Sequence, residues 1–120
     1  MPTSLACKRG DVVLVLFPNS DLRTAKHRPT LVVQANGLGT ELPQTIVAMI
    51  SSRMFRADHP SRITILLSSP EGHQSGLLSN SVVMTDNSAT VLNSAISEVI
   101  GNLPMVGVER GLRHTLDLPE

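Results

Sequence analysis

The chain has 120 residues and a formal net charge of zero, and 41% of its residues are hydrophobic. This length allows one domain with a hydrophobic core but not two, so we expect a single domain over residues 1–120. The one cysteine, Cys7, excludes an intramolecular disulfide, and no window has the roughly 18 apolar residues that a membrane span needs. We therefore expect a protein of the reducing cytoplasm that has no membrane partner.

Charge is distributed unevenly along this neutral chain. Residues 1–62 carry eight Lys and Arg against four Asp and Glu, a net charge of +4, and residues 63–120 carry two against six, a net charge of −4. A basic face is therefore compatible with a neutral protein. Phe17 and Phe55 are the only Phe, Tyr or Trp residues, which disfavours a nucleic-acid reader built on stacking platforms. A bound nucleic acid would be held mainly by hydrogen bonds and charge.

The first strong pattern is DVVLVLF, residues 11–17, an apolar and β-branched run that predicts a strand. Residues 18–29, PNSDLRTAKHRP, are polar and bracketed by prolines, so we expect an exposed loop that either closes a hairpin or covers a site. Turn residues separate four further segments that repeat the strand pattern. These segments are residues 30–34, 45–51, 62–67 and 81–85.

The order of these segments predicts the fold class. No helix of ten or more residues fits between the strands, which disfavours parallel βαβ units and predicts a mainly β fold, an antiparallel barrel or sandwich. Residues 92–103 fit either a short capped helix or a strand, and we expect a helical turn followed by a strand. Apolar residues after Pro104 share one helical face, which predicts a C-terminal helix, although Gly107 and Gly111 weaken that prediction.

The sequence lacks the patterns that are typical of several kinds of functional site. The four histidines lie far apart and form no H-x-x-x-H pair, so we expect neither a metal nor a cofactor. NGLGTELP, residues 36–43, does not open a helix as a phosphate-binding loop would, and no G-x-S-x-G nucleophile elbow occurs. What remains is a metal-free set of polar side chains at the ends of predicted strands, which can meet at one pole of a barrel. These are Arg28, Ser51, Ser52, Arg53 and Asp86.

The segment AKHRPTLVVQ, residues 25–34, places a cluster of basic and imidazole side chains beside a proline and a predicted strand. Lys26 and His27 fit a solvated loop. Arg28 has two interpretations: a loop cation, or a planar fork held by the strand and aimed at an anion such as phosphate. Position alone does not decide between them.

Four motifs, in this order, resemble the MazF/PemK family of toxins from bacterial type II toxin–antitoxin modules: KRGDVVLVLF, KHRPTLVVQ, TIVAMISS and GLLSNSVVMTD. The resemblance implies an SH3-like antiparallel β-barrel with a C-terminal helix, usually a homodimer. It implies a metal-independent endoribonuclease that cuts single-stranded RNA at short sequences, using the 2′-hydroxyl of the RNA as nucleophile. It also implies an antitoxin partner whose acidic segment covers the RNA groove.

The resemblance also implies roles for single residues. Arg28 matches the arginine of the family's R-P motif and would stabilise the phosphorane or shuttle a proton. Ser51 matches a hydroxyl residue that hydrogen-bonds the scissile phosphate, and Asp86 matches an acidic residue of some members that would act as a base or position one. The candidates for RNA binding are Arg23, Lys26, His27, Ser52 and Arg53.

Two positions depart from the family pattern. Met84 stands where some members have a catalytic arginine, and Ala89 stands where the arginine of an R-T-I-D element would fall. Their absence would weaken phosphate binding. Three functions therefore stay open: an RNA-cleaving toxin with a rearranged or weak site, a CcdB-like toxin that binds a protein such as DNA gyrase without catalysis, and an inactive module that only pairs with a partner protein.

Overall fold

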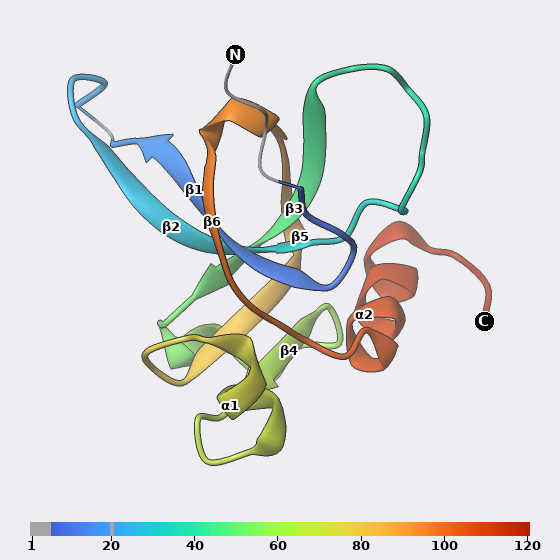
Figure 1. The fold of residues 1–120 in the computed structure, drawn as a ribbon. Coiled ribbons are helices and arrows are strands. Elements are labelled where there is room, and N and C mark those ends of the chain that lie inside the picture. Colours follow the sequence, from blue (N-terminus) through green and yellow to red (C-terminus); the bar gives the residue numbers. More distant parts are fainter. Residues whose placement is uncertain (1–5, 20) are drawn as a thin grey trace.

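The fold is built on one antiparallel β-sheet. The computed structural model describes residues 6–19 and 21–120, and within them six strands pair in the order β4-β5-β3-β2-β1-β6 (Figure 1). The strands are β1 (Asp11–Pro18), β2 (Ala25–Val32), β3 (Gln44–Ser51), β4 (Arg62–Ile65), β5 (Ser81–Leu92) and β6 (Ile96–Asn102). The sheet is curved but not closed, since β4 and β6 are its edges. The predicted mainly β, antiparallel and barrel-like fold is confirmed.

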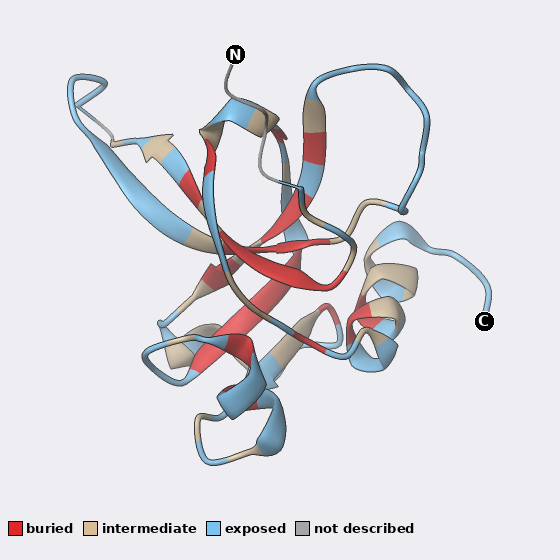
Figure 2. Cartoon of the chain, viewed as in Figure 1, coloured by how far each residue is buried: buried red, intermediate tan, exposed pale blue. Residues whose placement is uncertain are grey.

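Two apolar clusters form the core, and β1 contributes to both. Val12 packs with Leu31 in the first cluster, whereas Val13 and Val15 belong to the second. Successive strand residues point to opposite faces, so β1 is buried on both faces, which explains its unbroken apolar run. Figure 2 shows the buried residues concentrated along the middle of the sheet.

The β1–β2 hairpin extends beyond the core, and it corrects the expectation that residues 18–29 form a loop. Residues 25–29 belong to β2 and pair with β1 as far as Ala25 opposite Pro18. Most of this stretch is exposed (pale blue in Figure 2) and lacks the alternating apolar pattern by which a sequence indicates a strand. The first of the two alternatives was therefore right: the segment closes a hairpin.

Strand β5 is longer than the predicted strand over residues 81–85, and it contains a bulge. Its register against β3 jumps between Ala48 and Met49, which leaves residues 85–87 of β5 without a partner on β3. Asp86 was expected beyond the end of a strand, but it lies inside this bulge. A bulge of this kind re-aims side chains, and here it turns Asp86 toward β4.

The end of the chain folds as expected. A 3₁₀ turn, η2 (Asn93–Ala95), leads into β6, and α2 (Val106–Leu116) packs Val108 against the first core cluster. The close packing of α2 accounts for one of its glycines, because a Cβ on Gly111 would lie 3.0 Å from Cδ1 of Ile63. No helix in the described part of the chain is long and apolar enough to cross a membrane.

A second helix, α1 (Pro70–Ser75), was not predicted. The Ser69 hydroxyl accepts a hydrogen bond from the Gly72 N–H at 3.0 Å, and Pro70 follows this cap. At six residues it is too short for an apolar periodicity to develop. It positions the segment after it, residues 76–79, beside the ends of β2 and β3.

Candidate functional site

A groove of about 940 Å³ lies between the exposed half of β2, the end of β3 and the segment that follows α1. Four basic side chains line it, and none of the ten Asp and Glu residues of the chain does. The four are Lys26, Arg28, Arg53 and Arg56. The groove is therefore a concentrated positive site on a neutral protein, which suits an anionic ligand.

Arg28 projects from the β1–β2 ribbon. Its backbone lies opposite Val15, which is fully buried, so the main chain at Arg28 is tied to the core while the side chain is exposed. Within the described residues the guanidinium makes no hydrogen bond and no ion pair. Its five N–H donors are free to bind an anion.

Ser51 is the last residue of β3, the strand that pairs with β2, and it also lines the groove. Its Oγ accepts a hydrogen bond from the backbone N–H of Arg53 at 3.1 Å. This bond uses a lone pair of the hydroxyl oxygen and leaves its proton free to donate. Ser51 therefore offers a hydroxyl donor within the lining of the groove.

Arg56 ends a 3₁₀ turn, η1 (Met54–Arg56), that follows β3. Its Nη1 donates to Sδ of Met84 at 3.8 Å, and its Cζ lies 5.7 Å from the ring centroid of Phe55. Arg53 directly precedes this turn and has an extended backbone conformation. Both arginines line the groove.

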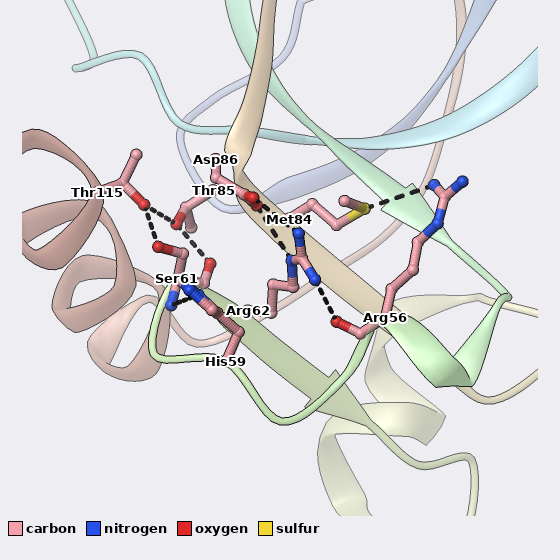
Figure 3. A network of polar contacts seen from close by, with 8 residues as sticks. All are labelled: Arg56, His59, Ser61, Arg62, Met84, Thr85, Asp86 and Thr115. Carbon is pink, nitrogen blue, oxygen red and sulfur yellow. Dashed lines mark hydrogen bonds and ion pairs between the residues drawn. The ribbon is translucent and has the colours of Figure 1, made fainter.

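Asp86 is bound by Arg62, as Figure 3 shows. Arg62 Nη2 lies 2.9 Å from one carboxylate oxygen of Asp86, and Nε lies 3.4 Å from the other. The third donor, Nη1, bonds the backbone carbonyl of Arg56 at 3.0 Å. One guanidinium thus links the β5 bulge to η1.

The electrostatic state of Asp86 follows from this contact. The hydrogen bonds from Arg62 hold the pKa of the Asp86 carboxyl below its ordinary value, against a smaller opposing effect of burial. A carboxylate that is stabilised in this way is a weak base. Asp86 is also absent from the lining of the groove.

Behind this pair, a hydroxyl cluster anchors the bulge. Thr85 is buried, and its Oγ1 donates to the carbonyl of Ser61 at 2.5 Å. The hydroxyl of Thr115, on α2, donates to Ser61 Oγ at 2.7 Å and lies 2.8 Å from Thr85 Oγ1 (Figure 3). These bonds fix the residue before Asp86 against the residue before Arg62.

The groove brings together most of the residues that the sequence indicated. Arg28 and Ser51 line it, together with all but one of the predicted RNA-binding residues: Lys26, His27, Ser52 and Arg53. The structure does not bring Asp86 or Arg23 to this groove. Arg23 lies in the β1–β2 turn, where its N–H donates to the Asp21 carboxylate at 2.9 Å.

Sequence reasoning missed Arg56. The signal that could have found it is the R-x-x-R spacing of Arg53 and Arg56 directly after a predicted strand.

The described residues contain no group of three or more His, Cys, Asp or Glu side chains that could hold a metal ion.

Comparison with known proteins decides the family. Residues 8–114 match the family model described as PemK-like, MazF-like toxin of type II toxin–antitoxin system. The chain belongs to this family. The toxin is 32% identical over 104 residues to Endoribonuclease MazF6 of Mycobacterium tuberculosis, an alignment that covers 86% of this chain and 90% of the relative. The same figures apply to Endoribonuclease MazF2 of Mycobacterium bovis.

The fold of this PemK/MazF-like toxin also occurs in solved structures. An endoribonuclease from a mycobacterial species, in complex with its cognate antitoxin, aligns with a TM-score of 0.73 at 19% identity, covering 96% of this chain and 99% of that chain. A MazE–MazF complex from Deinococcus radiodurans aligns with a TM-score of 0.70 at 18% identity, covering 94% and 97%. These likenesses establish a shared fold.

The two positions without the expected arginines have different surroundings in this PemK/MazF-like toxin. Met84 lines the groove, and the guanidinium of Arg56 lies against its sulfur. Ala89 packs against the second core cluster and is not part of the groove. Arg56 of η1 therefore places a positive charge beside Met84. Ala89 lies outside the groove that the four basic side chains line.

Proposed function

We propose that this PemK/MazF-like toxin is an endoribonuclease that cuts single-stranded RNA at short sequences in the groove, without a metal ion. The observation that carries the proposal is a groove in which Arg28 and Ser51 meet three further cations and no carboxylate of the described chain. The relatives named endoribonucleases, which are similar over most of both chains, support the reaction class.

The groove residues suit attack by the 2′-oxygen of the RNA on the adjacent phosphorus. The P–O5′ bond breaks, and the products are a 2′,3′-cyclic phosphate and a 5′-hydroxyl. The phosphorane on this path carries extra negative charge, which Arg28 would bind with paired N–H donors and Ser51 with its hydroxyl proton. Arg28 would thereby lower the barrier of the reaction rather than only hold the substrate.

The proton that leaves the 2′-hydroxyl can be carried by one base and returned to the leaving 5′-oxygen. Asp86 is a poor candidate for this transfer because Arg62 occupies its carboxylate. His27 is the only imidazole in the lining of the groove, and imidazole exchanges protons readily near neutral pH. We therefore assign the proton transfer to His27. Arg23 remains a proposed contact for RNA that extends beyond the groove.

The proposal includes partners and location. A relative of the same fold was solved with its cognate antitoxin, and we propose that this toxin also pairs with one, whose acidic segment neutralises the groove. We further propose a homodimer that acts in the cytoplasm, where messenger RNA is available. A CcdB-like role in binding DNA gyrase is not favoured, because the curated relatives are named endoribonucleases.

The decisive experiment incubates the purified protein with long single-stranded RNA in the presence of EDTA and sequences the new 5′ ends. We expect cuts at a short recurring sequence, with 5′ ends that require phosphorylation before ligation. Arg28→Ala should abolish the cuts, and Arg110→Ala, an exposed arginine on α2 outside the groove, should not. Intact RNA after incubation with folded wild-type protein would refute the proposed function.

A further inference from the structure

The side chain of Arg56 makes only weak contacts within the described part of the protein, with the ring of Phe55 and the sulfur of Met84. Its Nη1 donates to a thioether sulfur, which is a weak acceptor, and within the described residues its side chain forms no ion pair. The side chain is half-buried, so a bound anion would meet a guanidinium that is already partly desolvated. Such a group is suited to a phosphate.

The position of Arg56 depends on another arginine. The turn η1 has no side-chain cap and is closed by two backbone bonds, Arg56 N–H to the Arg53 carbonyl and Ala57 N–H to the Met54 carbonyl, each at 3.0 Å. A 3₁₀ turn of three residues is weak by itself. The bond from Arg62 Nη1 to the Arg56 carbonyl ties the turn to the sheet.

Arg62 can hold that carbonyl because Asp86 fixes its orientation. Two of its donors are directed to the Asp86 carboxylate, which leaves Nη1 pointing at η1. Asp86 is itself held in place by the β5 bulge and by the hydrogen bond from the hydroxyl of Thr85 to the Ser61 carbonyl. A rigid path thus runs from the core through Asp86 and Arg62 to Arg56 (Figure 3).

We propose that Arg56 binds a phosphate of the RNA in the groove, and that Asp86 and Arg62 are positioning residues that act through Arg56. This inference rests on the proposed function, because it names further residues of the same site. It gives Asp86 an indirect role, in which its carboxylate orients a cation and takes no part in proton transfer.

The test measures binding of a fluorescent single-stranded DNA oligonucleotide of mixed sequence, which lacks the 2′-hydroxyl and is not cut. A phosphate contact on a single strand contributes about 0.7 to the slope of log affinity against log salt concentration. We expect Arg56→Ala to lower the slope by about that amount and the affinity about tenfold. Arg56→Lys should keep the slope, and Arg110→Ala should match wild type.

The role of Asp86 is tested by a double-mutant cycle. Asp86→Asn should weaken binding about threefold to tenfold in the wild-type background and have no further effect in the Arg56→Ala background, because it acts through Arg56. Asp86→Glu should retain part of the wild-type affinity. Each variant is first shown to be folded by circular dichroism at the assay temperature.

Two results would overturn the inference. Wild-type affinity and slope in Arg56→Ala would remove Arg56 from the phosphate contacts. Equal effects of Asp86→Asn in both backgrounds would show that Asp86 does not act through Arg56. These outcomes are separate from the proposed function. If the wild-type protein cuts RNA but the Arg56→Ala variant binds the oligonucleotide with wild-type affinity, only this inference is refuted. If binding depends on Arg56 but the wild-type protein never cuts RNA, only the proposed endoribonuclease activity is refuted.

Discussion

Arg62 and Asp86 form a two-point contact in which Nη2 lies 2.9 Å from Oδ2 and Nε lies 3.4 Å from Oδ1. Arg62 begins β4 and Asp86 lies in the β5 bulge, so the pair spans two neighbouring strands. It connects parts of the chain that are 24 residues apart, beside the groove but outside its lining. Substitutions in this pair, and in the groove beside it, test the role of each residue.

Arg28→Ala should lower kcat for RNA cleavage by about 10²–10³, the usual cost of removing one donor that stabilises a charged transition state. Arg28→Lys should recover only part of the rate, because an ammonium cannot reproduce two parallel N–H bonds. Single-turnover cleavage of a labelled RNA that contains the mapped site gives both rates. A wild-type rate in Arg28→Ala would remove this residue from the mechanism.

His27→Gln should reduce kcat by about 10²-fold, since general acid–base catalysis contributes roughly that factor. Oligonucleotide affinity should change little, because the glutamine keeps the size and polarity of the side chain. A wild-type kcat in His27→Gln would assign the proton transfer to another group.

Ser51→Ala should slow cleavage about tenfold, the effect of losing one hydrogen bond of about 1.5 kcal/mol. Ser51→Thr retains a hydroxyl at the end of β3 and should cleave at close to the wild-type rate. Both rates are measured with saturating RNA, so that binding does not limit them. Equal losses in the two variants would indicate a steric cause rather than the hydroxyl.

Asp86→Asn should lower stability at neutral pH by at most about 1 kcal/mol, because the pair with Arg62 is partly exposed. The pKa of Asp86 is lower in the folded protein than in the unfolded chain, so its contribution exists above the ordinary aspartate value of about 3.9 and disappears as pH falls through the folded value. Urea midpoints at pH 7, 5, 4 and 3 should converge for wild type and variant.

The exposed Glu98 on β6 provides the control for this pH series. Glu98→Gln should track wild type over the whole range, because within the described residues Glu98 forms no ion pair. A difference between wild type and Asp86→Asn that stays constant down to pH 3 would contradict the electrostatic origin of the effect.

Two glycines should respond in opposite directions to alanine. A Cβ on Gly101 of β6 would lie 2.4 Å from the carbonyl oxygens of Gln74 and Ser75, so Gly101→Ala should destabilise the protein by about 1–3 kcal/mol. A Cβ on Gly107 of α2 would meet only Ile63 Cγ2 at 3.9 Å, so Gly107→Ala should stabilise it by about 0.5–1 kcal/mol. Urea denaturation measures both. Destabilisation by Gly107→Ala would contradict the open surface seen beside α2.

The parts of the fold that the sequence indicated are those that the core dictates. The runs in β1 and β3 and the first half of β5 are apolar because they are buried, and the amphipathic pattern of α2 survives its two glycines. The exposed half of β2 escaped prediction because its backbone pairing with β1 places no demand on side-chain polarity. Helix α1 escaped because six residues are held by local capping.

The candidate site was likewise predicted only in part from the sequence. Arg28 and Ser51 were found because each directly adjoins a recognisable apolar strand run and belongs to a family motif. Asp86 was named, but its surroundings depend on a bulge and on an arginine 24 positions earlier, which no local pattern reveals. Arg56 was missed because a three-residue turn brings it to the groove, and such turns leave little trace in composition.

The absence of carboxylates from the groove lining has a consequence for how RNA is approached. A chain with no net charge exerts little attraction beyond the screening distance of about 8 Å in physiological salt, so distant polyanions do not draw it in. At contact, the four basic side chains of the groove favour an orientation in which the groove faces the RNA strand. The toxin would thus bind RNA through short-range contacts in the groove rather than through long-range attraction.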